Sequence, residues 1–149
     1  PTLPKNQLLR VYNLKLMRLY RYIAQNENIN CMIVHSLDGY DEISLTFPFK
    51  VVTNDKEIVL EASSLGLSGA TPEDLYGGET VEEAAKVFDD VLSCRASEAK
   101  RNCVIANAAF ALLTLDPNLG MSEAVAQARE SLESGAALDS FRRFVELNK

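Results

Sequence analysis

The sequence predicts an α/β fold: a βαβ sheet unit, an antiparallel hairpin extension and a C-terminal group of helices. Two strand-like segments, "QLLRVY" at 7–12 and "NCMIVHSL" at 30–37, flank a segment with helical periodicity. The second is apolar without interruption, as expected of a strand covered on both faces in a parallel sheet. From Thr80 onward the chain carries helix caps and helical spacing in place of strand patterns.

The first unit is the strand 7–12, a helix over 14–26 and the strand 30–37. Asn13 stands where a helix N-cap is expected. One helical face, predicted to pack on the sheet, consists of Leu16, Leu19, Tyr20 and Ile23. Strand, helix and strand in this order indicate a βαβ unit with a right-handed crossover.

The pattern changes after Glu42. "ISLT", "FKVVT" and "EIVLEA" predict two or three antiparallel strands, with a turn at Asn54 to Lys56. The Gly- and Ser-rich stretch "SSLGLSGATPEDLYGG" predicts a surface connection, in which Thr71 and Pro72 begin a short helical turn.

Two helices follow this connection. Thr80 and Glu83 form a capping box for a helix that ends near Ser93. Its predicted apolar face consists of Ala84, Val87, Phe88, Val91 and Leu92. Ser97 caps the next helix, which is apolar on most sides through "CVIANAAFALLTL" and stops at Asp116 and Pro117, so we expect a central buried helix.

Two further helices close the chain. Ser122 is the expected cap of the first, and Gly135 its left-handed stop. "LDSFRRFVELNK" predicts a closing amphipathic helix. Its apolar positions are Leu138, Phe141 and Val145.

Composition narrows the function classes. The 149 residues fit one domain with a single core, and no apolar run approaches the length of a membrane span. The net charge is -6, and no Lys and Arg cluster is dense enough to follow a phosphate backbone, which argues against nucleic acid as a partner. Three cysteines without a Cys-x-x-Cys pair indicate reduced thiols in a cytoplasmic protein.

Because "PTLPKNQLLRVYN" leads almost directly into a strand without a starting methionine, we expect a fragment.

The candidate site lies in "VHSLDGYDEISLT", where Asp41 and Glu42 follow the strand 30–37. Ligands of open α/β sheets bind at the carboxyl ends of the strands, and Gly39 permits the bend that would let both carboxylates reach one ligand. Two hard oxygen ligands suit Mg²⁺, which takes one or two protein carboxylates and completes its shell with water and substrate phosphate. The alternative is ordinary solvated charge on a loop.

Two other polar residues invite a functional interpretation. His35, the sole histidine, is either a general base or a hydrogen-bonded strand-end residue, and the second is favoured because no acid or nucleophile can be paired with it. Asn107 interrupts the apolar helix, and we expect neighbouring backbone to satisfy it. "YGGE" lacks the strand and the lysine that a phosphate-binding P-loop requires.

Five segments together resemble the carboxyl-terminal half of anthranilate phosphoribosyltransferase, over essentially all 149 residues and in the family's order. They are "NQLLRVYN", "VHSLDGYDEISLT", "TPEDLYGGETVEEAAKVFDDVL", "NCVIANAAFAL" and "ARESLESGAAL". "DGYDE" is the most specific. Related pyrimidine nucleoside phosphorylases share the fold but not this segment.

The resemblance implies a Mg²⁺-dependent pentosyltransferase of tryptophan biosynthesis. In that family anthranilate displaces diphosphate from phosphoribosyl diphosphate, and the acidic pair matched here by Asp41 and Glu42 holds the Mg²⁺. It implies that residues 1–149 are the C-terminal part of the α/β catalytic domain in a phosphoribosyltransferase/nucleoside phosphorylase-like fold. The N-terminal helical domain and the Gly-rich diphosphate loop would precede Pro1, and the full-length enzyme would be a cytoplasmic homodimer.

The resemblance has local exceptions and open alternatives. Arg10 stands where the family generally has glycine, and "FPFK" diverges. Because the anthranilate and diphosphate residues would precede Pro1, we expect the 149-residue chain alone to be inactive. A non-catalytic binding paralogue and a pyrimidine nucleoside phosphorylase relative remain alternatives.

Overall fold

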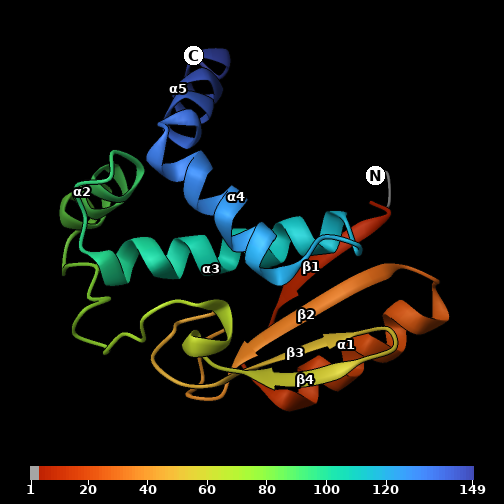
Figure 1. Cartoon of the computed structure of the whole chain (residues 1–149). Coiled ribbons are helices and arrows are strands. Elements are labelled where there is room, and N and C mark those ends of the chain that lie inside the picture. The colour runs from red at the N-terminus through yellow and green to blue at the C-terminus, as the bar shows by residue number, and fades with distance from the viewer. Residues whose placement is uncertain (1–3) are drawn as a thin grey trace.

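The structure is a computed structural model that describes residues 4–149 (Figure 1). Its centre is a four-stranded sheet in the order β1-β2-β3-β4. The strands are β1 (Asn6–Arg10), β2 (Asn30–Ser36), β3 (Phe49–Thr53) and β4 (Glu57–Leu60). β1 and β2 are parallel, whereas β2, β3 and β4 are successively antiparallel. The predicted α/β class is confirmed, and the sheet is mixed.

Helix α1 (Leu14–Asn26) connects the two parallel strands, as predicted. Asn13 caps it by accepting a hydrogen bond from the Leu16 N–H at 2.9 Å. The predicted packing face is partly wrong: Leu16 packs against the buried cluster, whereas Leu19, Tyr20 and Ile23 are exposed. The helix instead buries Met17 and Ala24 against the sheet. Small Ala24 permits close approach of the helix to the strands, and flexible Met17 fills the remaining space.

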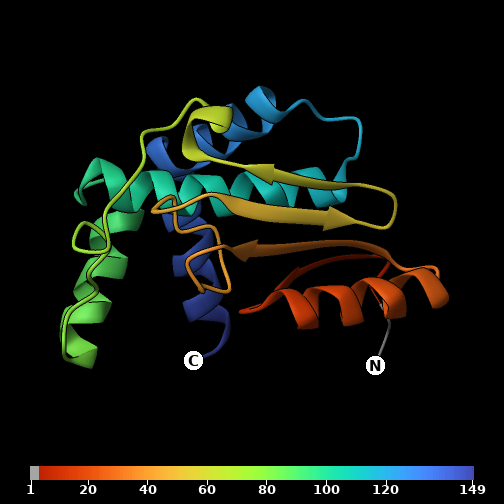
Figure 2. The ribbon, with the colours of Figure 1, turned by 90° about the horizontal axis from the view of Figure 1, so that it is seen from below.

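The opposite face of the sheet carries α3 (Glu98–Leu115), so the sheet lies between α1 and α3 (Figure 2). Phe110 of α3 meets Phe49 of β3 edge to face, with ring centroids 5.6 Å apart. Ser97 caps α3, which ends at Leu115 just before Asp116, both as predicted. The main core lies on this side and includes Val34, Ile43, Leu45, Ile105, Ala106 and Ala109.

The hairpin is formed by β3 and β4 alone. Its turn closes with a 2.9 Å hydrogen bond from the Thr53 N–H to the Lys56 carbonyl, as the sequence predicts. "ISLT" is not a strand. Ile43 and Leu45 are buried, but Leu45 has φ +61°, a left-handed conformation that interrupts an extended strand.

The remaining elements surround α3 and the sheet. They are η1 (Ala62–Leu65), α2 (Val81–Leu92), α4 (Met121–Glu133) and α5 (Ala136–Leu147). The capping box of Thr80 and Glu83 is confirmed. Gly120, not Ser122, is the N-cap of α4, because the helix starts at Met121. Gly135 has the predicted left-handed φ, +85°.

Helices α2 and α5 are more exposed than predicted. Val91 is the buried residue of α2, while Phe88 is 47% exposed and packs on Phe141 of α5 at 4.9 Å between ring centroids. Both helices project away from the sheet (Figure 1). No helix within residues 4–149 combines the length and the apolar character needed to cross a membrane.

Candidate functional site

The candidate site is the segment 37–48, which leaves the carboxyl end of β2 and returns as β3. Its first turn is closed by two 3.0 Å hydrogen bonds, from the Gly39 N–H to the Ser36 carbonyl and from the Ser36 N–H to the Tyr40 carbonyl. Gly39 has φ +103°, a conformation that favours glycine. The predicted bend is therefore present, and Asp41 and Glu42 follow it directly.

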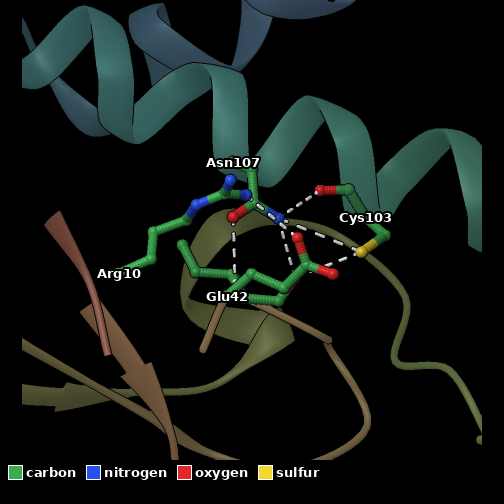
Figure 3. Close-up of polar contacts among 5 residues, drawn as sticks. Arg10, Glu42, Cys103 and Asn107 are labelled. Carbon is green, nitrogen blue, oxygen red and sulfur yellow. Dashed lines mark hydrogen bonds and ion pairs between the residues drawn. The ribbon is translucent and has the colours of Figure 1, made fainter. Parts of the chain in front are cut away.

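Glu42 lies beside the carboxyl end of β1. Its Oε2 is 3.1 Å from Nη1 of Arg10, the last residue of that strand (Figure 3). Because β1 and β2 are parallel, both carboxyl ends meet at this edge of the sheet, and the ion pair joins them. No local sequence pattern indicates this pair, since its members are 32 residues apart.

Asp41 is exposed, and within residues 4–149 its carboxylate has no hydrogen bond or ion pair. The same residues contain no group of three His, Cys, Asp or Glu side chains arranged to hold a metal ion. Two adjacent carboxylates nevertheless suit Mg²⁺ as a partial set of hard oxygen donors, because this ion keeps several waters and also takes substrate phosphate oxygens. Their assignment as metal ligands stays a prediction.

Helix α3 holds the backbone immediately after Glu42. The Ile43 N–H donates to Oδ1 of Asn107 at 3.2 Å, and Nδ2 of Asn107 donates to the Ile43 carbonyl at 2.9 Å. Nδ2 also donates to the Cys103 carbonyl at 2.9 Å. Figure 3 shows this clamp beside Glu42. The expectation that backbone satisfies Asn107 is confirmed, but its distant partner was not predictable from local pattern.

Cys103 supports the same backbone position. Its thiol donates to the Ile43 carbonyl at 3.1 Å. Burial, and secondly the negative charge of Glu42, raise the pKa of Cys103 to about 11. Burial also raises the pKa of Cys31. Both effects favour the protonated thiol over the thiolate, so these cysteines are poor candidates for nucleophiles.

A hydroxyl network, not anticipated from the sequence, stabilises the other side of the segment. Ser44 Oγ lies 2.8 Å from Ser36 Oγ and 2.7 Å from Thr46 Oγ1. Thr46 Oγ1 also donates to the Asp38 carboxylate. Ser36 and Ser44 are buried, so the network satisfies polar groups that would otherwise be costly to desolvate. Together with the Asn107 clamp it fixes the backbone on both sides of the acidic pair.

His35 has a structural role in this arrangement. It is 5% exposed, and its Nδ1 lies 2.9 Å from the Val11 carbonyl. A carbonyl only accepts hydrogen bonds, so Nδ1 carries the proton and donates it. The expectation of a hydrogen-bonded residue near the strand end is confirmed.

Comparison with known proteins identifies a family. Residues 1–138 match the profile of "Glycosyl transferase family, a/b domain". The chain is 51% identical over 148 residues to an anthranilate phosphoribosyltransferase of Phocaeicola vulgatus, and 49% identical to that of Bacteroides thetaiotaomicron. Each alignment covers 99% of this chain and 45% of the relative. The chain thus spans less than half the length of these curated relatives.

Solved structures show the same fold. The anthranilate phosphoribosyltransferase of Thermus thermophilus is 26% identical, with a TM-score of 0.81 over 92% of this chain and 41% of its own. A variant of the Saccharomyces cerevisiae enzyme with Mg bound is 25% identical, with a TM-score of 0.81 over 93% of this chain and 42% of its own. The yeast enzyme with PRPP and Mg has a TM-score of 0.84 at 24% identity, covering 95% and 41%.

Proposed function

Because this chain belongs to the Glycosyl transferase family, a/b domain, we propose that it forms the C-terminal part of the α/β catalytic domain of an anthranilate phosphoribosyltransferase. The 51% identity to a curated enzyme of that name supports the proposal. The reaction transfers phosphoribosyl from phosphoribosyl diphosphate to anthranilate and releases diphosphate, a step of tryptophan biosynthesis. Both compounds are the partners we propose for the whole protein.

The observation that carries the proposal is the position of the acidic pair. Asp41 and Glu42 follow a buried parallel strand at the edge where α/β sheets bind ligands. The backbone beside them is fixed by Asn107 from α3. Solvated charge on a loop needs no such support, whereas a metal site does, because its ligands must keep a defined spacing.

We propose Mg²⁺ as the cofactor, held by the carboxylates of Asp41 and Glu42. When bound, this ion would offset the negative charge on a departing diphosphate. The Mg-bound yeast variant supports this choice of metal. The chain's own contribution is to present two hard oxygen donors on a fixed backbone.

The test is the double substitution Asp41→Asn and Glu42→Gln in the intact protein. It removes both charges with little change in shape, so the Mg²⁺-dependent turnover of anthranilate and phosphoribosyl diphosphate should fall at least roughly a hundredfold. Asp55→Asn is the matched control, because Asp55 is an exposed acid in the turn at the opposite end of the sheet. The turnover of the Asp55→Asn variant should equal that of the unchanged protein.

Equal turnover by the double variant and the unchanged protein would overturn the metal assignment. Absence of turnover in both proteins would instead favour a non-catalytic relative that retained the scaffold. The proposal also includes a cytoplasmic location, supported by the free cysteines, and a homodimer of the whole protein, supported by the family resemblance alone. Light scattering of the purified protein measures its oligomeric state directly.

A further inference from the structure

Among the residues that the structure describes, Arg10 is the cation that forms an ion pair with a proposed metal ligand. Its guanidinium Nη1 is 3.1 Å from the Glu42 carboxylate, and the two side chains are 52% and 45% exposed (Figure 3). The pair connects the end of β1 to the segment after β2. Arg10 therefore occupies an oxygen of the same carboxylate that we assign to the metal.

We propose that Arg10 is an affinity-determining residue, which competes with the divalent ion for Glu42 and so sets how tightly the acidic pair binds it. This inference rests on the proposed function, because it takes Asp41 and Glu42 as metal ligands. The competition is electrostatic: a guanidinium lowers the negative charge available to the ion and repels the ion itself.

Hydrogen bonds hold the backbone at Arg10 and next to Glu42, so backbone movement cannot separate the ion pair. Arg10 lies opposite Val34 in the parallel ladder, and the next residue, Val11, donates to the Val34 carbonyl at 3.1 Å. On the other side, Asn107 holds Ile43. Arg10 and Glu42 can therefore part only by rotating their side chains, so an arriving ion must displace the guanidinium or share the carboxylate with it.

The size of the effect follows from the charges. An ion bound to the Glu42 oxygen would lie about 5 Å from the guanidinium, which in screened, water-like surroundings weakens divalent binding by roughly fivefold. Cys103 adds no opposing charge, since its raised pKa of about 11 keeps the thiol neutral at physiological pH. Asp41 precedes Glu42 in the chain and adds a second negative charge.

The test is Mn²⁺ binding to the intact protein, followed by the loss of the free-ion paramagnetic resonance signal. Arg10→Ala should tighten binding roughly fivefold, and the gain should shrink as added salt screens the charges. Arg10→Lys keeps the charge and should stay close to the unchanged protein. Arg143→Ala, which removes a charge from α5 at a distance from the site, should have no effect.

Equal or weaker Mn²⁺ binding by the Arg10→Ala variant overturns the inference. Glu42→Gln, measured in the same way, separates this failure from failure of the proposed function. If Glu42→Gln abolishes binding while Arg10→Ala leaves it unchanged, the metal site stands and only the competition is wrong. If Glu42→Gln changes nothing, the metal assignment fails and the inference fails with it. Thermal melts of each variant verify that it is folded.

Discussion

Replacing Asn107 with leucine should destabilise the protein through the segment that follows the acidic pair. The side chain supplies an acceptor for the Ile43 N–H at 3.2 Å and a donor for the Ile43 carbonyl at 2.9 Å. Leucine has a similar volume but neither group. The carbonyl keeps one partner, the Cys103 thiol at 3.1 Å, whereas the N–H loses its partner.

The cost follows from burial. Ile43 is 0% exposed, so water cannot replace the lost acceptor. A buried, unpaired N–H costs about 1–3 kcal/mol, and the lost carbonyl hydrogen bond adds about 1 kcal/mol. The free energy of unfolding should therefore fall by about 2–4 kcal/mol.

Urea unfolding followed by circular dichroism measures this change. Asn102→Leu is the matched control, because Asn102 is buried on the same helix. Within residues 4–149 it makes one long hydrogen bond of 3.4 Å to Glu98 and its Oδ1 has no partner. Removing such a group should alter stability by less than about 1 kcal/mol. If both variants lose the same stability, the clamp is not what stabilises this segment, and the reasoning is refuted.

Three further predictions concern the core, the thiol and the activity. Phe49→Ala should lower the free energy of unfolding by about 3–5 kcal/mol in the same assay, because Phe49 is 0% exposed, and a loss below about 1 kcal/mol would contradict its core position. The pKa of Cys103 is raised from 9.0 to about 11, so its protonated form stabilises the fold below pH 9 and this contribution is lost as pH rises toward 11. In the Cys103→Ser variant, the free energy of unfolding measured with urea should therefore fall less steeply between pH 9 and pH 11. An equally steep fall in the variant and the unchanged protein would contradict this role of the thiol. The 149-residue polypeptide alone should give no transferase turnover, and measurable product in a direct assay would show otherwise.

Local signals in the sequence were sufficient for the starts of α1, α2 and α3, but not of α4. Asn13, Thr80 and Ser97 each cap a helix through contacts within three residues, so chain-local chemistry determines these starts. The buried face of α1 was not predictable in this way. Leu19 is more apolar than Ala24, yet the sheet buries Ala24, because close approach to the strands decides the orientation of the helix.

The candidate site was predictable only in the part that depends on contacts between residues close in the sequence. Gly39 and its bend are local, so the positions of Asp41 and Glu42 after β2 followed from the sequence. Their supports are not local: Arg10 is 32 residues before Glu42, and Asn107 is 64 residues after Ile43. Only the parallel pairing of β1 with β2 and the packing of α3 bring them together.

These two supports act through different physics, which makes their roles separable. Asn107 hydrogen-bonds to buried backbone, so its replacement by leucine should lower the free energy of unfolding. The segment after the acidic pair should then be held less firmly, which should also weaken Mn²⁺ binding. Arg10 and Glu42 form an exposed ion pair, which contributes about 0–1 kcal/mol to stability. Removing Arg10 should therefore tighten metal binding and leave the unfolding free energy almost unchanged. Opposite effects of the two substitutions on metal affinity would mean that α3 positions Glu42, while β1 limits how strongly it binds a cation.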